Sequence, residues 1–280
     1  MTEVVLRKIE DGVAILTFNR PDRLNAWTPE MQTQYFDLLE DCALSEDVRV
    51  IVLTGAGRGF CAGADMQNLQ ALSGGDLDRS STAHDERPVT HPLTIPKPII
   101  AAINGPCAGL GLVHAVMCDL RFVAAEAKLT TAFARRGLVA EHGLSWMLPR
   151  LVGPARALDL LLSGRVVLGA EAAEMGLANW SVPDGRALEE ALTYARMLAA
   201  ECSPASMAVM KRQVYADYER TIDQTVEEAN RLMAESFERP DFGEGVQSFV
   251  ERRAPAFPPL AGPPTGGNGV LAGQPADVAS

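Results

Sequence analysis

The chain has 280 residues, of which 47% are hydrophobic and 22% are charged, so it is long enough to bury a sizeable core. Its net charge of −11 excludes general binding to nucleic acid, because the phosphates carry charge of the same sign. The longest apolar runs are too short or too interrupted to span a bilayer, and Met1–Glu10 is too charged for a signal peptide. We therefore expect a cytoplasmic protein without a membrane partner.

The five cysteines are widely spaced and include no Cys-x-x-Cys pair. This pattern disfavours a disulfide framework and a zinc site, and it favours buried thiols in a reducing compartment. We therefore expect no bound metal.

The first half of the chain alternates strands, turns and helices. Val4–Ile9 and Val13–Phe18 flank an Asp-Gly dipeptide, which is typical of a tight hairpin turn. Thr28-Pro29 offers an N-cap and a first residue for a helix that we predict to end at Ala43. Near-continuous apolar runs then predict strands of a parallel sheet that is covered on both faces: Val48–Thr54, Lys97–Ile103 and Leu120–Ala124. This order indicates an α/β fold built from right-handed βαβ units.

From about Gly153 the pattern becomes helical. The predicted helices are Ala155–Leu162, Ala170–Met175, Arg186–Ala200, Pro204–Tyr218, Ile222–Ser236 and Phe242–Arg253. The polar stretch Leu72–His91 has no periodicity and predicts a long loop that serves as a lid or a pocket wall. Ala254–Ser280 is rich in Pro, Gly and Ala and predicts a flexible tail.

Two turns of small residues each follow a predicted strand and lead into a helix: Gly59–Asp65 and Asn104–Gly111. Small residues let a ligand approach the main chain, and a helix start supplies unpaired N–H groups. A dinucleotide is one candidate ligand, but the Gly-Leu-Gly of the second turn lacks a third glycine, and Asp119 comes too early for the ribose. An oxyanion hole, in which two backbone amides meet at one carbonyl oxygen, would use both turns. The alternative is that these glycines serve only the geometry of tight turns.

Four segments, in chain order, resemble signature segments of the crotonase superfamily, also called the enoyl-CoA hydratase/isomerase family. They are Asn19–Ala26, Phe60–Asp65, Ala102–Asp119 and Phe249–Phe257. The resemblance implies an α/β fold of the crotonase type: a spiral of ββα units with a helical C-terminal trimerisation region, assembled as a trimer or a dimer of trimers. It implies a core with the acyl-CoA site over 1–200, a helical region for oligomerisation and CoA contact over 201–257, and a flexible tail over 258–280.

The resemblance also implies roles for single residues. The backbone N–H groups of Ala64 and Leu110 would form the oxyanion hole for a thioester enolate. Coenzyme A would be part of the substrate, with no tightly bound cofactor. Its expected contacts are Arg23, Leu24, Arg58, Ala62, Phe249 and Arg252. The last two are three residues apart in a predicted helix, so they would share one face and reach the coenzyme A of a neighbouring subunit.

The chain departs from the family at its two catalytic glutamates, where it has Val113 and Phe133. Neither side chain can carry a proton. Glu141 aligns with the base of some family isomerases, although its carboxylate could instead cap a helix over Leu144–Leu151. A lone carboxylate suits isomerisation, whereas hydration needs a second group to orient water, and His142 is a candidate for that group.

Adjacent side chains in an extended turn point apart, so Glu141 and His142 are not expected to share a water molecule. His114 is expected to be a packed helix residue, and Asp65 to shape its turn. These patterns predict an acyl-CoA enzyme that hydrates an enoyl-CoA or shifts its double bond. One alternative is a non-catalytic acyl-CoA-binding homologue, suggested by the two lost glutamates. Another is a dehydrogenase that uses the second glycine turn.

Overall fold

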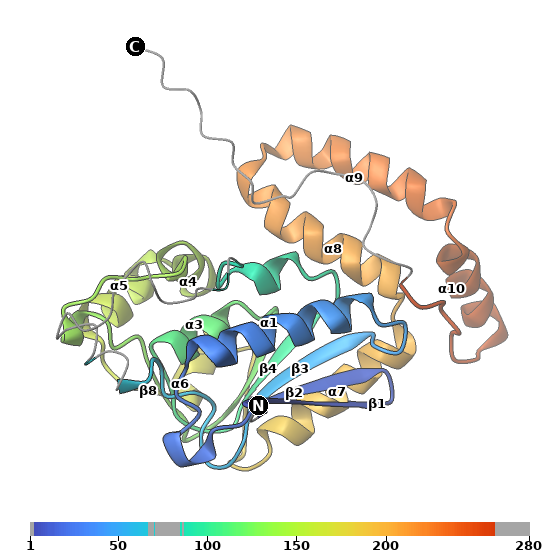
Figure 1. Cartoon of the computed structure of the whole chain (residues 1–280). Coiled ribbons are helices and arrows are strands. Elements are labelled where there is room, and N and C mark those ends of the chain that lie inside the picture. The colour runs from blue at the N-terminus through green and yellow to red at the C-terminus, as the bar shows by residue number, and fades with distance from the viewer. Residues whose placement is uncertain (1–2, 67–69, 71–84, 86, 261–280) are drawn as a thin grey trace.

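A six-stranded sheet forms the centre of the protein (Figure 1). The structure is a computed structural model that describes residues 3–66, 70, 85 and 87–260. The strand order is β1 (Val5–Glu10), β2 (Val13–Phe18), β3 (Val50–Gly55), β4 (Ile99–Ile103), β6 (Leu120–Ala124) and β9 (Trp180–Val182). β1 pairs antiparallel with β2, and the other neighbours pair in parallel. A three-stranded sheet contains β5 (Cys107–Ala108), β7 (Lys128–Thr130) and β8 (Val167–Leu168).

The hairpin between β1 and β2 confirms the prediction from Asp11-Gly12. Both residues have positive φ, 51° and 76°, as a tight two-residue hairpin turn requires. The predicted strand over Lys97–Ile103 is two residues too long, because β4 begins at Ile99. Lys97 instead donates from Nζ to the carbonyls of Cys42 and Ser45, at 2.7 and 2.5 Å. These two carbonyls lie at the C-terminal end of the helix over Pro29–Leu44 and have no acceptor role inside it.

The two faces of the large sheet carry separate cores, because successive strand side chains point to opposite faces. Val50 and Val52 of β3 pack with the alanines of α7 (Ala187–Glu201), whereas Ile51 and Leu53 pack in the cluster that includes α1 and α3. Figure 1 shows α1 (Pro29–Leu44) and α3 (Leu110–Val116) on one side of the sheet and α7 on the other. The parallel strands are therefore covered on both sides, as their continuous apolar sequence predicted.

The remaining helices follow the predicted order with small shifts at their ends. They are α4 (Leu144–Val152), α5 (Pro154–Ser163), α6 (Gly169–Glu174), α8 (Pro204–Ala216), α9 (Ile222–Phe237) and α10 (Pro240–Glu251). The shorter 3-10 helices are η1 (Pro21–Arg23), η2 (His91–Thr94), η3 (Ala134–Arg136) and η4 (Asp217–Glu219). None of the helices among the described residues combines the length and apolar character needed to cross a membrane.

The C-terminal helices project from the sheet and its covering helices (Figure 1). An ion pair between Lys211 Nζ and Asp119 Oδ2 at 2.7 Å joins α8 to the turn before β6, and the Tyr215 hydroxyl donates to the same carboxylate at 2.9 Å. After α10 the chain returns to the core, where Arg49 donates to the Phe257 carbonyl at 2.7 Å. The predicted loop Leu72–His91 and tail Ala254–Ser280 lie largely outside the described residues.

All five cysteines are free thiols. Cys42, Cys61, Cys107 and Cys118 are buried, and Cys202 is half-buried. Burial raises the pKa of Cys61 to about 12, so its thiol is protonated and unreactive at neutral pH. The four buried thiols agree with the packing role that we expected.

Candidate active site

The two glycine-rich turns lie against each other. The Cys61 N–H donates to the Pro106 carbonyl at 3.2 Å, and the Ala108 N–H donates to the Cys61 carbonyl at 3.0 Å. A methyl group added to Gly63 would lie 2.9 Å from the Ala108 carbonyl oxygen, and one added to Gly111 would lie 2.1 Å from the Cys61 carbonyl oxygen. Close packing of the two turns therefore accounts for both glycines, and Gly111 gives no support to the dinucleotide alternative.

Ala64 is the residue after Gly63, and Leu110 is two residues after Ala108, so both amides lie beside the contact between the two turns. Trp27 bonds to the main chain on both sides of Ala64: its N–H donates to Gly63 at 2.8 Å, and its carbonyl accepts from Asp65 at 3.1 Å. In this pairing the N–H of Ala64 points to the opposite side. Leu110 is the first residue of α3, where an amide has no acceptor inside the helix. Within the described part of the chain, neither of these two N–H groups donates a hydrogen bond.

Glu141 and His142 lie in the turn before α4, and their side chains are each 38% exposed. Glu141 Oε2 and His142 Nε2 are 3.6 Å apart, so the expectation that these side chains point apart was wrong. The reason is the left-handed backbone of His142, with φ of 54°, which no extended turn has. The capping alternative for Glu141 was also wrong: the Leu144 N–H donates to the main-chain carbonyl of Glu141 at 3.1 Å, and among the described residues no N–H of α4 donates to its carboxylate.

The turn at Glu141 lies next to Met117, the residue that follows α3. A methyl group on Gly143 would be 3.3 Å from Thr90 Cγ2 and 3.8 Å from Met117 Cε. The positions of the family glutamates, Val113 and Phe133, are 0% and 4% exposed. These two side chains are therefore part of the apolar core and supply no proton-transfer group.

His114 packs in the core, as we expected of a helix residue. Its side chain is 0% exposed, and its ring stacks on the Trp27 indole with centroids 3.7 Å apart. Burial lowers the pKa of His114 to about 3, and the nearby His142 adds to this effect. His114 is consequently neutral at physiological pH. No sequence pattern indicated that Trp27 would lie between this ring and the first glycine turn.

Asp65 anchors the first glycine turn to the chain before it. Its carboxylate forms an ion pair with Arg20 at 2.9 Å, in which the side chains are only 22% and 11% exposed. Arg20 also donates to the Ala26 carbonyl. This contact fits the structural role predicted for Asp65, although the sequence did not identify Arg20 as its partner.

The candidate residues for coenzyme A fall into two groups. Leu24 accepts from the Ala62 N–H at 3.0 Å, which joins η1 to the first glycine turn. Arg23 and Arg58 are exposed beside them, and neither guanidinium pairs with a carboxylate of the described residues. This first group therefore lies with Ala64 and presents two free positive charges on an acidic protein.

The second group is Phe249 on α10 and Arg252, the residue that follows this helix; α10 lies at the opposite end of the molecule from α4 and α5 in Figure 1. The prediction that both residues share a helical face was wrong. α10 ends at Glu251, and Arg252 has left-handed backbone with φ of 55°. The Phe249 side chain is 85% exposed. In this single chain, therefore, these residues do not join the first group.

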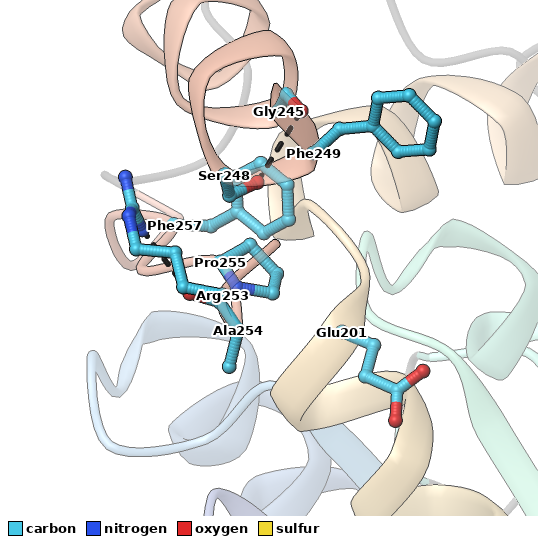
Figure 2. Close-up of a pocket in the computed structure, with 8 residues that line it drawn as sticks. All are labelled: Glu201, Gly245, Ser248, Phe249, Arg253, Ala254, Pro255 and Phe257. Carbon is cyan, nitrogen blue, oxygen red and sulfur yellow. Dashed lines mark hydrogen bonds between the residues drawn. The ribbon is translucent and has the colours of Figure 1, made fainter. Parts of the chain in front are cut away.

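Figure 2 shows an open cleft where α10 and the returning chain meet the end of α7. Its volume is about 420 Å³, and its lining residues are Glu201, Gly245, Ser248, Phe249, Arg253, Ala254, Pro255 and Phe257. The Phe249 ring projects away from Arg253 and Pro255. Arg253 is already engaged, because it forms ion pairs with Glu244 and Glu251 at 2.6 and 2.7 Å. The cleft thus offers apolar surface but no free cation.

Comparisons with known proteins agree with these observations. The model of the enoyl-CoA hydratase/isomerase family matches residues 8–259. A 1,2-epoxyphenylacetyl-CoA isomerase of Escherichia coli is 34% identical over 92% of this chain and 99% of its own length. The crystal structure of an enoyl-CoA hydratase from Mycobacterium marinum is 49% identical, with a TM-score of 0.67 over 78% of this chain and 100% of that one. An enoyl-CoA hydratase from Polaromonas has a TM-score of 0.84 and 29% identity, over 90% and 99% of the two chains.

Proposed function

Since this chain belongs to the enoyl-CoA hydratase/isomerase family, and is thus an acyl-CoA enzyme of the crotonase type, we propose that it shifts the double bond of an enoyl-CoA through a thioester enolate. The observation that carries the proposal is the meeting of the two glycine turns, beside which the amides of Ala64 and Leu110 are free to donate. Hydration of a 2-enoyl-CoA is the alternative reaction at the same site.

In the proposed mechanism the thioester oxygen accepts hydrogen bonds from the Ala64 and Leu110 amides. Removal of a proton from the acyl chain moves negative charge onto this oxygen, and the two donors stabilise the enolate that results. Fixed backbone donors need no reorganisation during the reaction, and the loss of one such donor typically costs about 2.7–4 kcal/mol of transition-state stabilisation.

Glu141 is the proposed acid/base. Its carboxylate would take a proton from one carbon of the enoyl chain and return it to another, which moves the double bond without adding water. The apolar, buried Val113 and Phe133 support isomerisation over two-carboxylate hydration. Among the relatives, the Escherichia coli protein is named as an isomerase, and the Mycobacterium and Polaromonas proteins are named as hydratases. If water is added, His142, 3.6 Å from Glu141, is the group that would orient it.

Substrate binding is proposed to use both groups of coenzyme A residues. Arg23 and Arg58 would meet phosphates of a coenzyme A held beside Leu24 and Ala62. Phe249 and Arg252 would reach the coenzyme A of a neighbouring subunit. Coenzyme A enters only as part of the thioester, and no other cofactor takes part in the proposal.

The helical region over 201–257 is proposed to assemble the protein as a trimer or a dimer of trimers in the cytoplasm. Each of its three helices exposes apolar side chains, such as Met210 on α8, Ile222 on α9 and Val250 on α10, which are 61%, 74% and 73% exposed. Large apolar side chains that are exposed on several helices favour burial against another copy. Size-exclusion chromatography with light scattering should give a mass of three or six chains, and a monomer would contradict this assembly.

The function can be tested with 2-enoyl-CoA and 3-enoyl-CoA substrates, followed by ultraviolet absorbance and product analysis. Glu141→Gln should lower the rate constant for double-bond shift by at least about 10²-fold, because it removes the proton-transfer group and keeps the shape. Glu174→Gln, which changes an exposed glutamate of α6, is the matched control. Full turnover by Glu141→Gln with both substrates would exclude Glu141 as the base.

A second candidate function is acyl-CoA binding without catalysis, supported by the loss of both family glutamates. It predicts tight binding of a coenzyme A ester by calorimetry and no product from any enoyl-CoA. Turnover of either substrate in the assay above would exclude it.

A further inference from the structure

The Trp27 indole and the His114 imidazole stack with their ring planes 30° apart. We propose that this stack is a positioning pair that fixes the Ala64 and Leu110 amides relative to each other, an inference that rests on the proposed function. Neither ring touches the reacting atoms in this proposal. The pair acts through the main chain at each end.

At one end, Trp27 holds the first glycine turn. Its backbone bonds to Gly63 and Asp65, at 2.8 and 3.1 Å, flank Ala64 on both sides. Ala64 and Trp27 pair as an isolated parallel bridge that belongs to neither sheet. No extended strand pairing therefore helps to hold Ala64 in place. If the Trp27 indole moves, the Trp27 main chain moves with it, and so does the Ala64 amide between the two bonded residues.

At the other end, His114 lies one turn of α3 after Leu110. Three further rings surround its imidazole, with centroids 5.7–6.5 Å away: Phe18, Tyr35 and Phe36. Neither ring nitrogen of His114 has a hydrogen-bond partner among the described residues. Ring contacts, and above all the close stack on Trp27, therefore hold this side chain and the start of α3.

The imidazole of His114 lowers the stability of the folded state, because its buried donor and acceptor have no hydrogen-bond partners among the described residues. Leucine has a similar size and no polar atoms. His114→Leu should therefore leave the protein at least as stable at neutral pH while it removes the stack. A residue with a purely structural role would instead lose stability and activity together.

Turnover is the first measurement. A misplacement of about 1 Å in an active site can cost about 10²-fold in rate, so we expect Trp27→Leu and His114→Leu each to lower kcat about 10- to 100-fold, with little change in KM. The double variant should be no slower than the slower single variant, because both remove the same contact. Trp27→Phe keeps an aromatic ring and should retain most of the activity.

Infrared spectroscopy of the bound thioester is the second measurement. The probe is hexanoyl-CoA labelled with ¹³C at the carbonyl carbon, which is saturated and has no double bond to shift. In the wild type the two amides should lower the carbonyl stretching frequency relative to the free ester. In both leucine variants the band should move back towards the free value, whereas Trp27→Phe should keep it near the wild-type value.

Phe122→Leu is the matched control, because Phe122 stacks on Trp180 at 4.4 Å and packs with the alanines of α7 in the other core cluster. An unchanged carbonyl band and kcat in both leucine variants would overturn the inference. Equal losses in Phe122→Leu would also overturn it, since the effect would then be general. If the wild type neither binds the ester nor shifts its band, the proposed function itself fails, which is a different result.

Discussion

Replacing His114 with leucine should make the stability of the protein less sensitive to acid. In the unfolded chain a histidine takes up a proton as the pH falls below about 6.5, whereas in the folded chain burial keeps His114 neutral down to a pKa of about 3. Between these two values the unfolded state binds more protons, so the free energy of unfolding falls as the pH falls. From these pKa values, the loss between pH 6 and pH 4 is about 2–3 kcal/mol for this one group.

The assay is urea denaturation at a fixed protein concentration, followed by far-ultraviolet circular dichroism at several pH values between 6 and 4. Other titrating groups act alike in the two proteins, so the difference in the free energy of unfolding between His114→Leu and wild type should grow by about 2–3 kcal/mol in favour of the variant. Phe122→Leu carries no titrating change and should keep the wild-type pH slope. A difference between His114→Leu and wild type that stays constant across this range would refute the reasoning.

Three further predictions concern the contacts that hold the site together. Gly63→Ala should lower turnover by more than about 10²-fold in steady-state assays, because the new methyl group would lie 2.9 Å from a carbonyl of the second turn and φ is 98°; wild-type turnover would contradict the packing argument. Lys211→Met should lower the free energy of unfolding by about 3 kcal/mol in urea, since it leaves the Asp119 carboxylate without its positive partner, and Asp119→Asn in the same chain should restore part of the loss. Arg20→Met should cost about 2 kcal/mol in the same assay through the loss of its bond to Asp65, and a loss near zero would show that this ion pair is fully screened.

Much of the fold could be predicted because turn conformation, helix capping and strand burial depend on residues close together in the sequence. Asp11 and Gly12 are residue types that tolerate positive φ, and the hydroxyl of Thr28 caps α1 by accepting from the Met31 N–H at 3.2 Å. Continuous apolar runs predicted the parallel strands, since a strand covered on both faces has no polar side. The two glycine turns could be recognised because each is a short local run of small residues, and their order along the chain led to the family.

Tertiary contacts decided the parts of the candidate site that sequence reasoning got wrong. The left-handed backbone at His142 and Arg252 belongs to residues that adopt it rarely, so no local preference predicted that Glu141 and His142 would approach or that α10 would stop before Arg252.

What the sequence by itself determined is the set of elements and the two turns that carry the backbone donors. Only the folded chain decided what holds those donors, because Trp27 and His114 are 87 positions apart by their numbers and meet only when α3 packs beside the first turn. Periodicity and capping depend on neighbours along the chain, whereas the Trp27–His114 contact depends on how α3 packs against the segment that contains Trp27.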